Sequence, residues 1–120
     1  MNDEKVFDIK KRAYIFGIEV IKITEEFSRT TASYIIQKQL IRSATSIGAN
    51  LMEGNYASSK KDFRNFINYS VKSTHETTYW LQLSKDLQLA STQKLEKLIA
   101  ESIEIRKILT TIILNSKKNS

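Results

Sequence analysis

The sequence predicts an all-α protein, an antiparallel up-down-up-down four-helix bundle. The 120 residues contain no proline and only three glycines, so little in the chain interrupts long helices. Apolar residues recur every three or four positions through four long segments, which is the period of a helix with one buried face. Connections of only about three to six residues force consecutive helices to run antiparallel, so the simplest arrangement is a bundle.

We expect residues 1–120 to form one domain, because its length suits one folding unit. The predicted helices cover about residues 5–27, 32–53, 60–87 and 92–114, followed by a basic tail at 115–120.

The first two helices are predicted from their apolar stripes and from the residues that bound them. The first stripe consists of Val6, Ile9, Ala13, Phe16, Val20, Ile23 and Phe27. Hydroxyl side chains at 28–31 then interrupt the pattern and can cap the second helix. The second stripe consists of Ile36, Leu40, Ala44, Ile47 and Leu51. Gly54 followed by Asn55 predicts a left-handed stop to this helix.

The last two helices are each preceded by a serine. Ser58 or Ser59 is expected to cap the third helix, whose inward positions are Phe63, Phe66, Ile67, Ser70, Thr74, Thr77 and Leu81. Its many hydroxyls indicate close packing against a neighbouring helix. Ser91 or Thr92 is expected to cap the fourth helix, whose stripe consists of Leu95, Leu98, Ile99, Ser102, Ile105, Leu109, Ile112 and Ile113.

Catalytic and metal chemistry finds little support in the sequence. The absence of cysteine excludes a disulfide framework, a thiol nucleophile, a zinc finger and an iron–sulfur cluster. The one histidine, His75, has Lys72 three residues before it, so the Glu-x-x-His motif of di-iron bundles is missing. No nucleophile elbow or phosphate-binding glycine loop occurs. We expect a non-enzymatic protein with no catalytic residues, no metal and no cofactor.

The chain does not begin with the basic segment and following apolar region that are typical of a signal peptide. Its apolar stretches are all far shorter than the roughly 20 residues that span a bilayer. A cytoplasmic protein without membrane association is expected.

The net charge of +6 is unevenly distributed along the chain. Residues 29–61 hold five basic groups and one acid, and residues 105–120 hold four basic groups and no acid. Such clusters of basic residues are typical of phosphate-binding surfaces. The alternative is that these side chains only keep the protein surface hydrated. The candidate phosphate contacts are Lys38, Arg42, Lys60, Lys61, Arg64, Lys117 and Lys118. Tyr56, near two of the lysines, either stacks on a base or packs as a lid.

Small residues dominate the second helix after Arg42, where Ser43, Ser46 and Asn50 form a polar seam beside the apolar stripe. The structural interpretation is that this seam hydrogen-bonds to the hydroxyl-rich third helix and that Arg42 pairs with Glu76. The functional interpretation makes Arg42, Asn50 and Glu53 a binding site.

These segments resemble a small bacterial four-helix-bundle family encoded in intervening sequences of 23S ribosomal RNA genes (S23-like). The resemblance rests on residues 39–44, on Ser46-Ile47, on Ala49-Asn50-Leu51 with Glu53-Gly54, on Lys61, Phe63 and Phe66-Ile67, and on Ser73, Glu76 and Trp80-Leu81. The family-motif residues are Arg42, Ser43, Ser46, Asn50, Glu53, Gly54 and Glu76. Departures from the family pattern are Gly48, Met52, Lys72, and Ser33-Tyr34 without a preceding proline.

The family is similar to the accessory protein of diversity-generating retroelements, a ring-shaped pentamer that binds nucleic acid and a reverse transcriptase. The resemblance therefore implies a homo-oligomer, a pentamer by preference, with RNA or DNA as a partner and a reverse transcriptase as a further one. The biological role of most members of the family is unknown.

Two functions from different classes follow. One is a nucleic-acid-binding oligomer, and the other is a structural or adaptor module for a protein partner that does not bind nucleic acid. In an oligomer, we expect apolar residues on outward faces to be buried between subunits, namely Tyr14, Ile21, Tyr69 and Tyr79.

Overall fold

The four long periodic segments form four α-helices. A computed structural model describes residues 3–119, with side chains from residue 8 onward. The helices are α1 (Asp3–Thr24), α2 (Thr31–Gly54), α3 (Lys60–Asp86) and α4 (Thr92–Lys118). No strand occurs within this part of the chain, which confirms the predicted all-α class.

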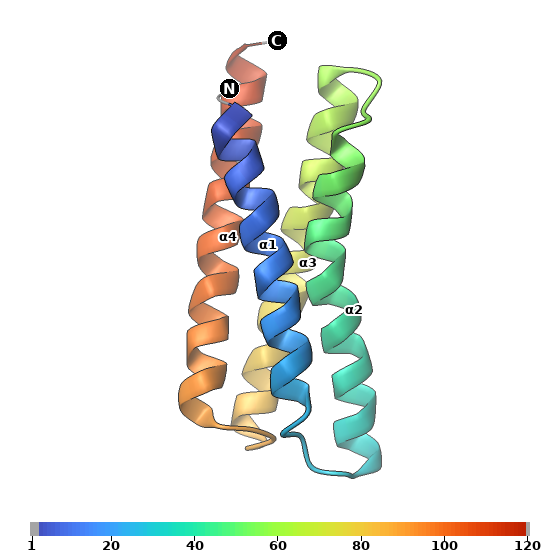
Figure 1. Ribbon diagram of the computed structural model, residues 1–120, viewed down its shortest axis with the longest axis vertical. Helices are drawn as coiled ribbons and strands as arrows, with labels where there is room; N and C mark the ends of the chain where they lie inside the picture. The colour runs from blue at the N-terminus through green and yellow to red at the C-terminus, as the bar shows by residue number, and fades with distance from the viewer. Residues whose placement is uncertain (1–2, 120) are drawn as a thin grey trace.

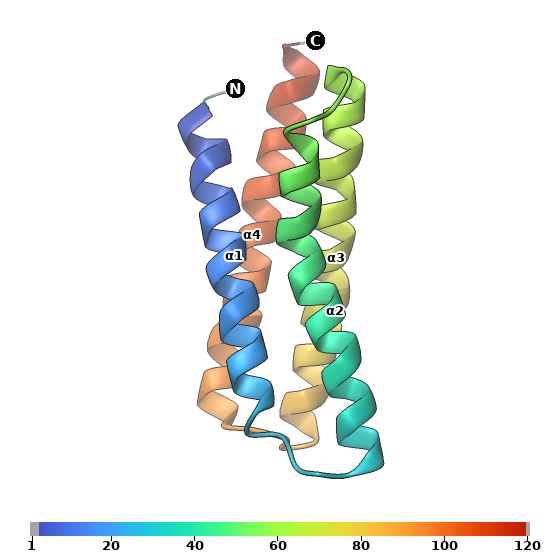
Figure 2. The same cartoon turned by 45° about the vertical axis from the view of Figure 1, so that its right-hand side comes forward.

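Each helix packs against two others, α1 and α3 each lying between α2 and α4. Figures 1 and 2 show the α1–α2 and α3–α4 connections at one end of the bundle. The α2–α3 connection lies at the other end, beside the start of α1 and the last turn of α4, and we call this the terminal end. Consecutive helices therefore run in opposite directions.

Hydroxyl groups cap three helices, as predicted. The Thr30 hydroxyl accepts a hydrogen bond from the Ser33 backbone N–H at 3.1 Å, and the Ser59 hydroxyl accepts one from Asp62 N–H at 3.0 Å. Ser91 caps α4 through Lys94 N–H at 3.3 Å. Each oxygen satisfies an amide that has no partner within its own helix.

Two predicted C-terminal boundaries need correction. α1 ends at Thr24, not at residue 27. The backbone N–H groups of residues 25–27 donate to carbonyls three residues earlier, not four, so this turn is tighter than an α-helix. Phe27 is nevertheless buried in the connection. The left-handed stop at Gly54-Asn55 is wrong, since Asn55 keeps a right-handed φ of −62°. The left-handed residue in the described chain is Gln88, after α3, at φ 56°.

The predicted basic tail at 115–120 is also wrong over the described residues. α4 continues to Lys118, because Ser116 is buried and continues the inward stripe of the helix by one more turn. Arg64 of α3 donates to the Ser116 hydroxyl at 3.4 Å, which holds this turn against the bundle. Lys117 and Lys118 therefore lie on a helix and not on a tail; Ser120 lies outside the described residues.

The predicted stripes form the core. Every stripe residue of α2 is buried, and so are those of α1 except Val6, whose side chain lies outside the described residues. Phe63, Phe66 and Ile99 are only half-buried, at the margins of α3 and α4. The buried aliphatic side chains supply the hydrophobic driving force for folding.

The α2–α3 contact is a hydrogen-bonded seam of small side chains. Thr77 donates to the Ser43 hydroxyl at 3.0 Å, Ser73 donates to Ser46 at 3.0 Å, and Ser70 donates to the Ile47 carbonyl at 2.9 Å. The structural interpretation of the seam is confirmed for these residues. Asn50 instead bonds within its own helix, donating to the Ser46 carbonyl at 2.9 Å.

Because Ser43 is fully buried in this seam, we predict that Ser43→Leu lowers the free energy of unfolding by about 1–3 kcal/mol through overpacking. Ser43→Ala should cost less than about 1 kcal/mol, because Thr77 keeps its bond to the Ser73 carbonyl. Urea denaturation measures both values, with Thr111→Leu on the exposed face of α4 as the control. Equal stability of Ser43→Leu and the wild type would contradict the close packing.

Candidate nucleic-acid interface

Five of the seven predicted phosphate contacts lie together at the terminal end. Lys60, Lys61 and Arg64 occupy the first turns of α3, and Lys117 and Lys118 occupy the last turn of α4. Two contacts join the groups: Lys60 Nζ donates to the Asn119 carbonyl at 2.5 Å, and Arg64 Nη1 lies 3.5 Å from the Ser116 carbonyl. The antiparallel pairing of α3 and α4 therefore merges two basic segments that are far apart in the sequence.

The same two helices carry further cations away from the terminal end. Arg106 Nη1 lies 3.4 Å from Nδ1 of His75, and Lys72 and Lys107 are exposed nearby along α3 and α4. We define the basic surface as the eight basic residues of 60–75 and 105–119, which are Lys60, Lys61, Arg64, Lys72, Arg106, Lys107, Lys117 and Lys118.

The basic surface accounts for the entire net charge of the chain. Residues 60–75 and 105–119 contain these eight basic residues and one acid, Asp62, an excess of seven positive charges. The remaining residues contain 11 basic and 12 acidic groups, an excess of one negative charge. Asp62 is itself occupied, since its carboxylate accepts bonds from Ser58 N–H at 3.0 Å and from the Ser58 hydroxyl at 3.3 Å.

Lys38 and Arg42 lie apart from the other five predicted contacts. The Arg42 guanidinium forms an ion pair with Glu76 and donates to the Gln39 side chain at 3.0 Å. Glu76 lies 16 residues beyond Lys60 on α3, or about 24 Å along the helix axis. Lys38 lies above the Tyr34 ring, 5.7 Å from its centroid. The structure therefore divides the seven predicted residues into two separate groups.

Sequence reasoning missed Lys72, Arg106 and Lys107 as members of one surface. Residues 62–104, which contain Lys72, hold five basic and six acidic groups, so this stretch does not stand out as basic. The available signal was the complete lack of acids in residues 63–75 and 105–119. Only the pairing of α3 with α4 brings these two stretches together.

The family-motif residues form a network on the α2–α3 side. One carboxylate oxygen of Glu76 accepts hydrogen bonds from both the Arg42 guanidinium and the Trp80 indole N–H, the latter at 3.0 Å. Gly54 is buried against Phe63 and Phe66, whereas Glu53 is exposed. The predicted Arg42–Glu76 pair is confirmed, and most of the motif serves helix packing.

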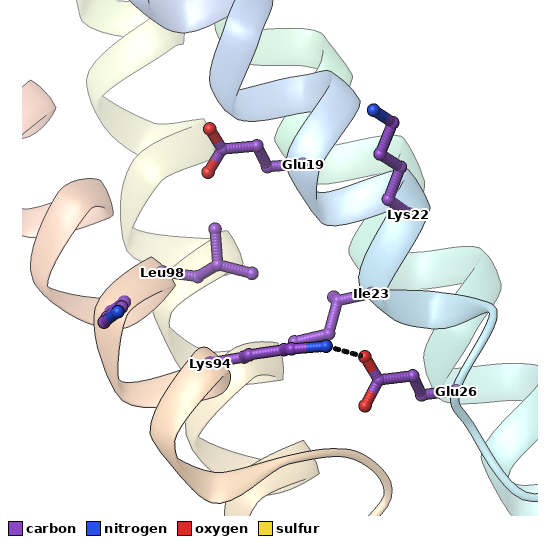
Figure 3. A pocket seen from close by; sticks show the side chains of 7 residues that line it. Glu19, Lys22, Ile23, Glu26, Lys94 and Leu98 are labelled. Carbon is purple, nitrogen blue, oxygen red and sulfur yellow. Dashed lines mark hydrogen bonds and ion pairs between the residues drawn. The ribbon is translucent and has the colours of Figure 1, made fainter.

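At the end of the bundle opposite the terminal end, acidic and basic side chains of α1, α4 and the α1–α2 connection lie near one another. Figure 3 shows a shallow pocket there, where Lys94 donates to the Glu26 carboxylate at 2.7 Å. The pKa of Glu26 lies below its usual 4.5, first because of this bond and second because the Ser91 backbone N–H also donates to the carboxylate. Nearer the terminal end, the Arg12 guanidinium donates two hydrogen bonds of 2.7 Å to the Glu101 carboxylate, and these bonds raise the pKa of Arg12.

Other classes of site find no support in the described part of the chain. No three histidine or acidic side chains among the described residues cluster closely enough to hold a metal ion. Nor is any helix in that part long and apolar enough to cross a membrane.

An all-α bundle with its positive charge gathered on one helix pair defines a small basic helical protein. The chain belongs to the 23S rRNA-intervening sequence protein family, whose model matches residues 5–111. It is similar to a protein of unknown function from the S23 ribosomal protein family of Bacteroides thetaiotaomicron, with 32% identity and a TM-score of 0.83. That match covers 91% of this chain and 97% of the other. No curated protein matches the chain.

The family resemblance is therefore confirmed. Similarity to the retroelement accessory protein stays a prediction.

We predict that Glu26→Gln lowers stability at neutral pH but not in acid. A carboxylate with a depressed pKa stabilises the folded state above its ordinary pKa, and this contribution is lost as the pH falls through the depressed value. Urea unfolding from pH 7 to pH 3 should show the difference between wild type and variant shrinking towards zero. Glu53→Gln is the control, since Glu53 has no side-chain partner among the described residues. A difference independent of pH would contradict the Glu26–Lys94 contact.

Proposed function

We propose that this protein is a non-enzymatic nucleic-acid-binding protein whose basic surface contacts the phosphate backbone. The observation that carries the proposal is that eight basic residues on α3 and α4 account for all of the excess positive charge. They extend from Lys60 to the level of His75, about 22 Å along α3. A duplex presents one phosphate charge per roughly 1.7 Å of its axis, so a surface of this length faces several phosphates at once.

Binding of this kind works by charge neutralisation. Lysine and arginine side chains replace the counterions condensed on the nucleic acid, and release of those counterions drives association. The affinity then falls steeply with salt and depends little on sequence. Arg64 and Arg106 add planar guanidinium groups that bond phosphate oxygens in pairs.

We further propose that the protein assembles into a ring-shaped homo-oligomer, with the pentamer favoured by the family resemblance. The supporting observation is an apolar groove between α1 and α2, with Tyr14, Ile18, Ile21 and Met52 along it. Tyr14 is 69% exposed in the single chain and Met52 is 55% exposed. This groove lies on a different helix pair from the basic surface, so contacts there leave the phosphate-binding residues accessible.

The second candidate is the structural or adaptor module, in which a protein such as a reverse transcriptase is the partner. The same apolar groove favours it, because exposed apolar patches mark protein interfaces. The two functions differ in whether the purified protein binds RNA or DNA at low salt.

The deciding variant for the proposed function is Lys60→Glu, Lys61→Glu and Arg64→Glu combined. We expect loss of binding to labelled structured RNA and duplex DNA at about 100 mM salt, because three contacts become repulsive. The helix should still form, since acids are favourable near a helix N-terminus. The corresponding alanine variant should reduce the slope of log affinity against log salt by about two to three.

A charge-matched control is Lys22→Glu, Arg29→Glu and Lys97→Glu, all of which lie away from the basic surface. It should bind much more strongly than the first variant. Equal affinities of the two variants would mean that only the net charge matters. Absence of wild-type binding at low salt, with the protein folded, would favour the adaptor function.

For assembly, we predict that Tyr14→Asp with Ile21→Asp converts the oligomer to monomer, because buried charges without partners are costly. Sedimentation velocity at micromolar concentration measures this. Leu114→Asp, at a residue 53% exposed on α4, is the control and should remain oligomeric. A wild-type protein that sediments as a monomer would contradict the proposed assembly.

A further inference from the structure

The solvent-facing side of α3 carries a regular row of polar side chains that the phosphate contacts alone do not explain. Lys61, Asn65, Asn68 and Lys72 follow one another at spacings of four, three and four residues, and all four are exposed. This spacing places them on one face of the helix, opposite the buried Ile67, Ser70 and Thr74. We call these four residues the outward row.

The two asparagines of the outward row have no structural role within the described residues. Neither side-chain amide forms a hydrogen bond there. Some other helical polar side chains do bond their own helix: Asn50 donates to the Ser46 carbonyl at 2.9 Å, and Thr110 donates to the Arg106 carbonyl at 2.9 Å. Asparagine is also a weaker helix former than alanine. Two unbonded amides therefore project from a basic helix at a small cost to helix stability.

We infer that α3 enters the major groove of duplex DNA, where Asn65 and Asn68 read the edges of adenine bases. This inference rests on the proposed nucleic-acid-binding function and adds a substrate class and two specificity residues to it. The side-chain amide of asparagine matches adenine N6 and N7 with two hydrogen bonds. Lys61 and Lys72 lie about 16 Å apart along the axis and bracket the amides, so they reach phosphates on either side of the bases read.

The basic residues of α4 complete the arrangement. On the neighbouring helix α4, Arg106 lies beside His75 of α3, and Lys107 and Lys118 are exposed. Arg64 lies between the two helices, where it contacts Ser116. Because these cations lie on one side of α3, they follow one wall of the groove and contact its phosphates. Phosphate contacts fix the position of the helix, and base contacts give the sequence preference.

The outward row itself contains no aromatic side chain, which favours a duplex over a single strand as its partner. Recognition of unpaired bases uses exposed aromatic rings as stacking platforms. Phe63 and Phe66 lie against Gly54 on the α2 side of the helix. The exposed rings nearby lie outside the row: Tyr69 is 51% exposed and packs edge-on against Phe66, and Tyr56, 86% exposed, lies in the α2–α3 connection. The major groove of B-form DNA, about 12 Å wide, admits an α-helix, whereas that of A-form RNA is too narrow for its side chains.

The experiment is selection from a randomised duplex DNA library with the full-length protein, followed by affinity measurements on the enriched and scrambled duplexes across a salt series. We expect a short motif containing adenine to be enriched. Asn65→Ala with Asn68→Ala should lower the preference for this motif by about tenfold to a hundredfold for each adenine read, with an unchanged salt slope. Lys61→Ala with Lys72→Ala should reduce the slope by about two and leave the preference unchanged.

Asn115→Ala, a helical asparagine outside the outward row, is the matched control and should keep the full preference. The asparagine variants are expected to fold, because alanine favours the helix. Salt-dependent binding with no enriched motif, or a preference that survives Asn65→Ala with Asn68→Ala, would overturn this inference and leave the proposed function standing. Tighter binding to an RNA duplex than to DNA of the same sequence would also overturn it. Absence of binding to any nucleic acid would overturn both.

Discussion

Close contact between α2 and α3 is the constraint on which the rest of the structure depends. Five hydroxyl side chains line the middle of this contact, and each takes part in a hydrogen bond across it: Ser43, Ser46, Ser70, Ser73 and Thr77. Small side chains let the two backbones approach, and their hydroxyls fix the axial register, since a shift of one turn would leave buried hydroxyls without partners. An all-leucine interface would supply more hydrophobic free energy but would define the axial register of the two helices less closely.

That register determines where the charges lie. With α3 fixed against α2, the pairing of α3 with α4 places Lys60 beside Asn119 and His75 beside Arg106. The acid-free stretches of both helices then overlap at one end of the bundle. At the other end, acids and bases meet in pairs, such as Glu26 with Lys94, and largely cancel. The bundle is therefore an electrostatic dipole in which one helix pair holds the excess positive charge.

The apolar groove and the basic surface, each of which lacks a partner in the single chain, lie on different helix pairs. The α1–α2 groove exposes tyrosine, isoleucine and methionine side chains that water solvates poorly. The basic surface of α3 and α4 holds like charges close together, which repel one another until an anionic partner compensates them. A molecule with an apolar face and a separate cationic face can assemble through the first and bind phosphates through the second. The outward row of α3 adds exposed hydrogen-bonding groups to the second surface.

The sequence by itself determined the helices, because their stripes, hydroxyl caps and lack of proline are local properties of the chain. It also identified the family, and it placed Arg42 opposite Glu76 through the spacing of a hydroxyl seam. It could not determine where α4 ends: the last turn depends on the burial of Ser116 and its contact with Arg64, residues 52 positions apart. The left-handed stop predicted at Gly54-Asn55 was wrong, because burial of Gly54 against Phe63 and Phe66 keeps the helix right-handed there. The tertiary structure alone decided which cations share a surface. Pairing of α3 with α4 brings Lys60 and Lys118 to the same end of the bundle and leaves Lys38 apart from both. The physical reason is that charges interact through space and not along the chain.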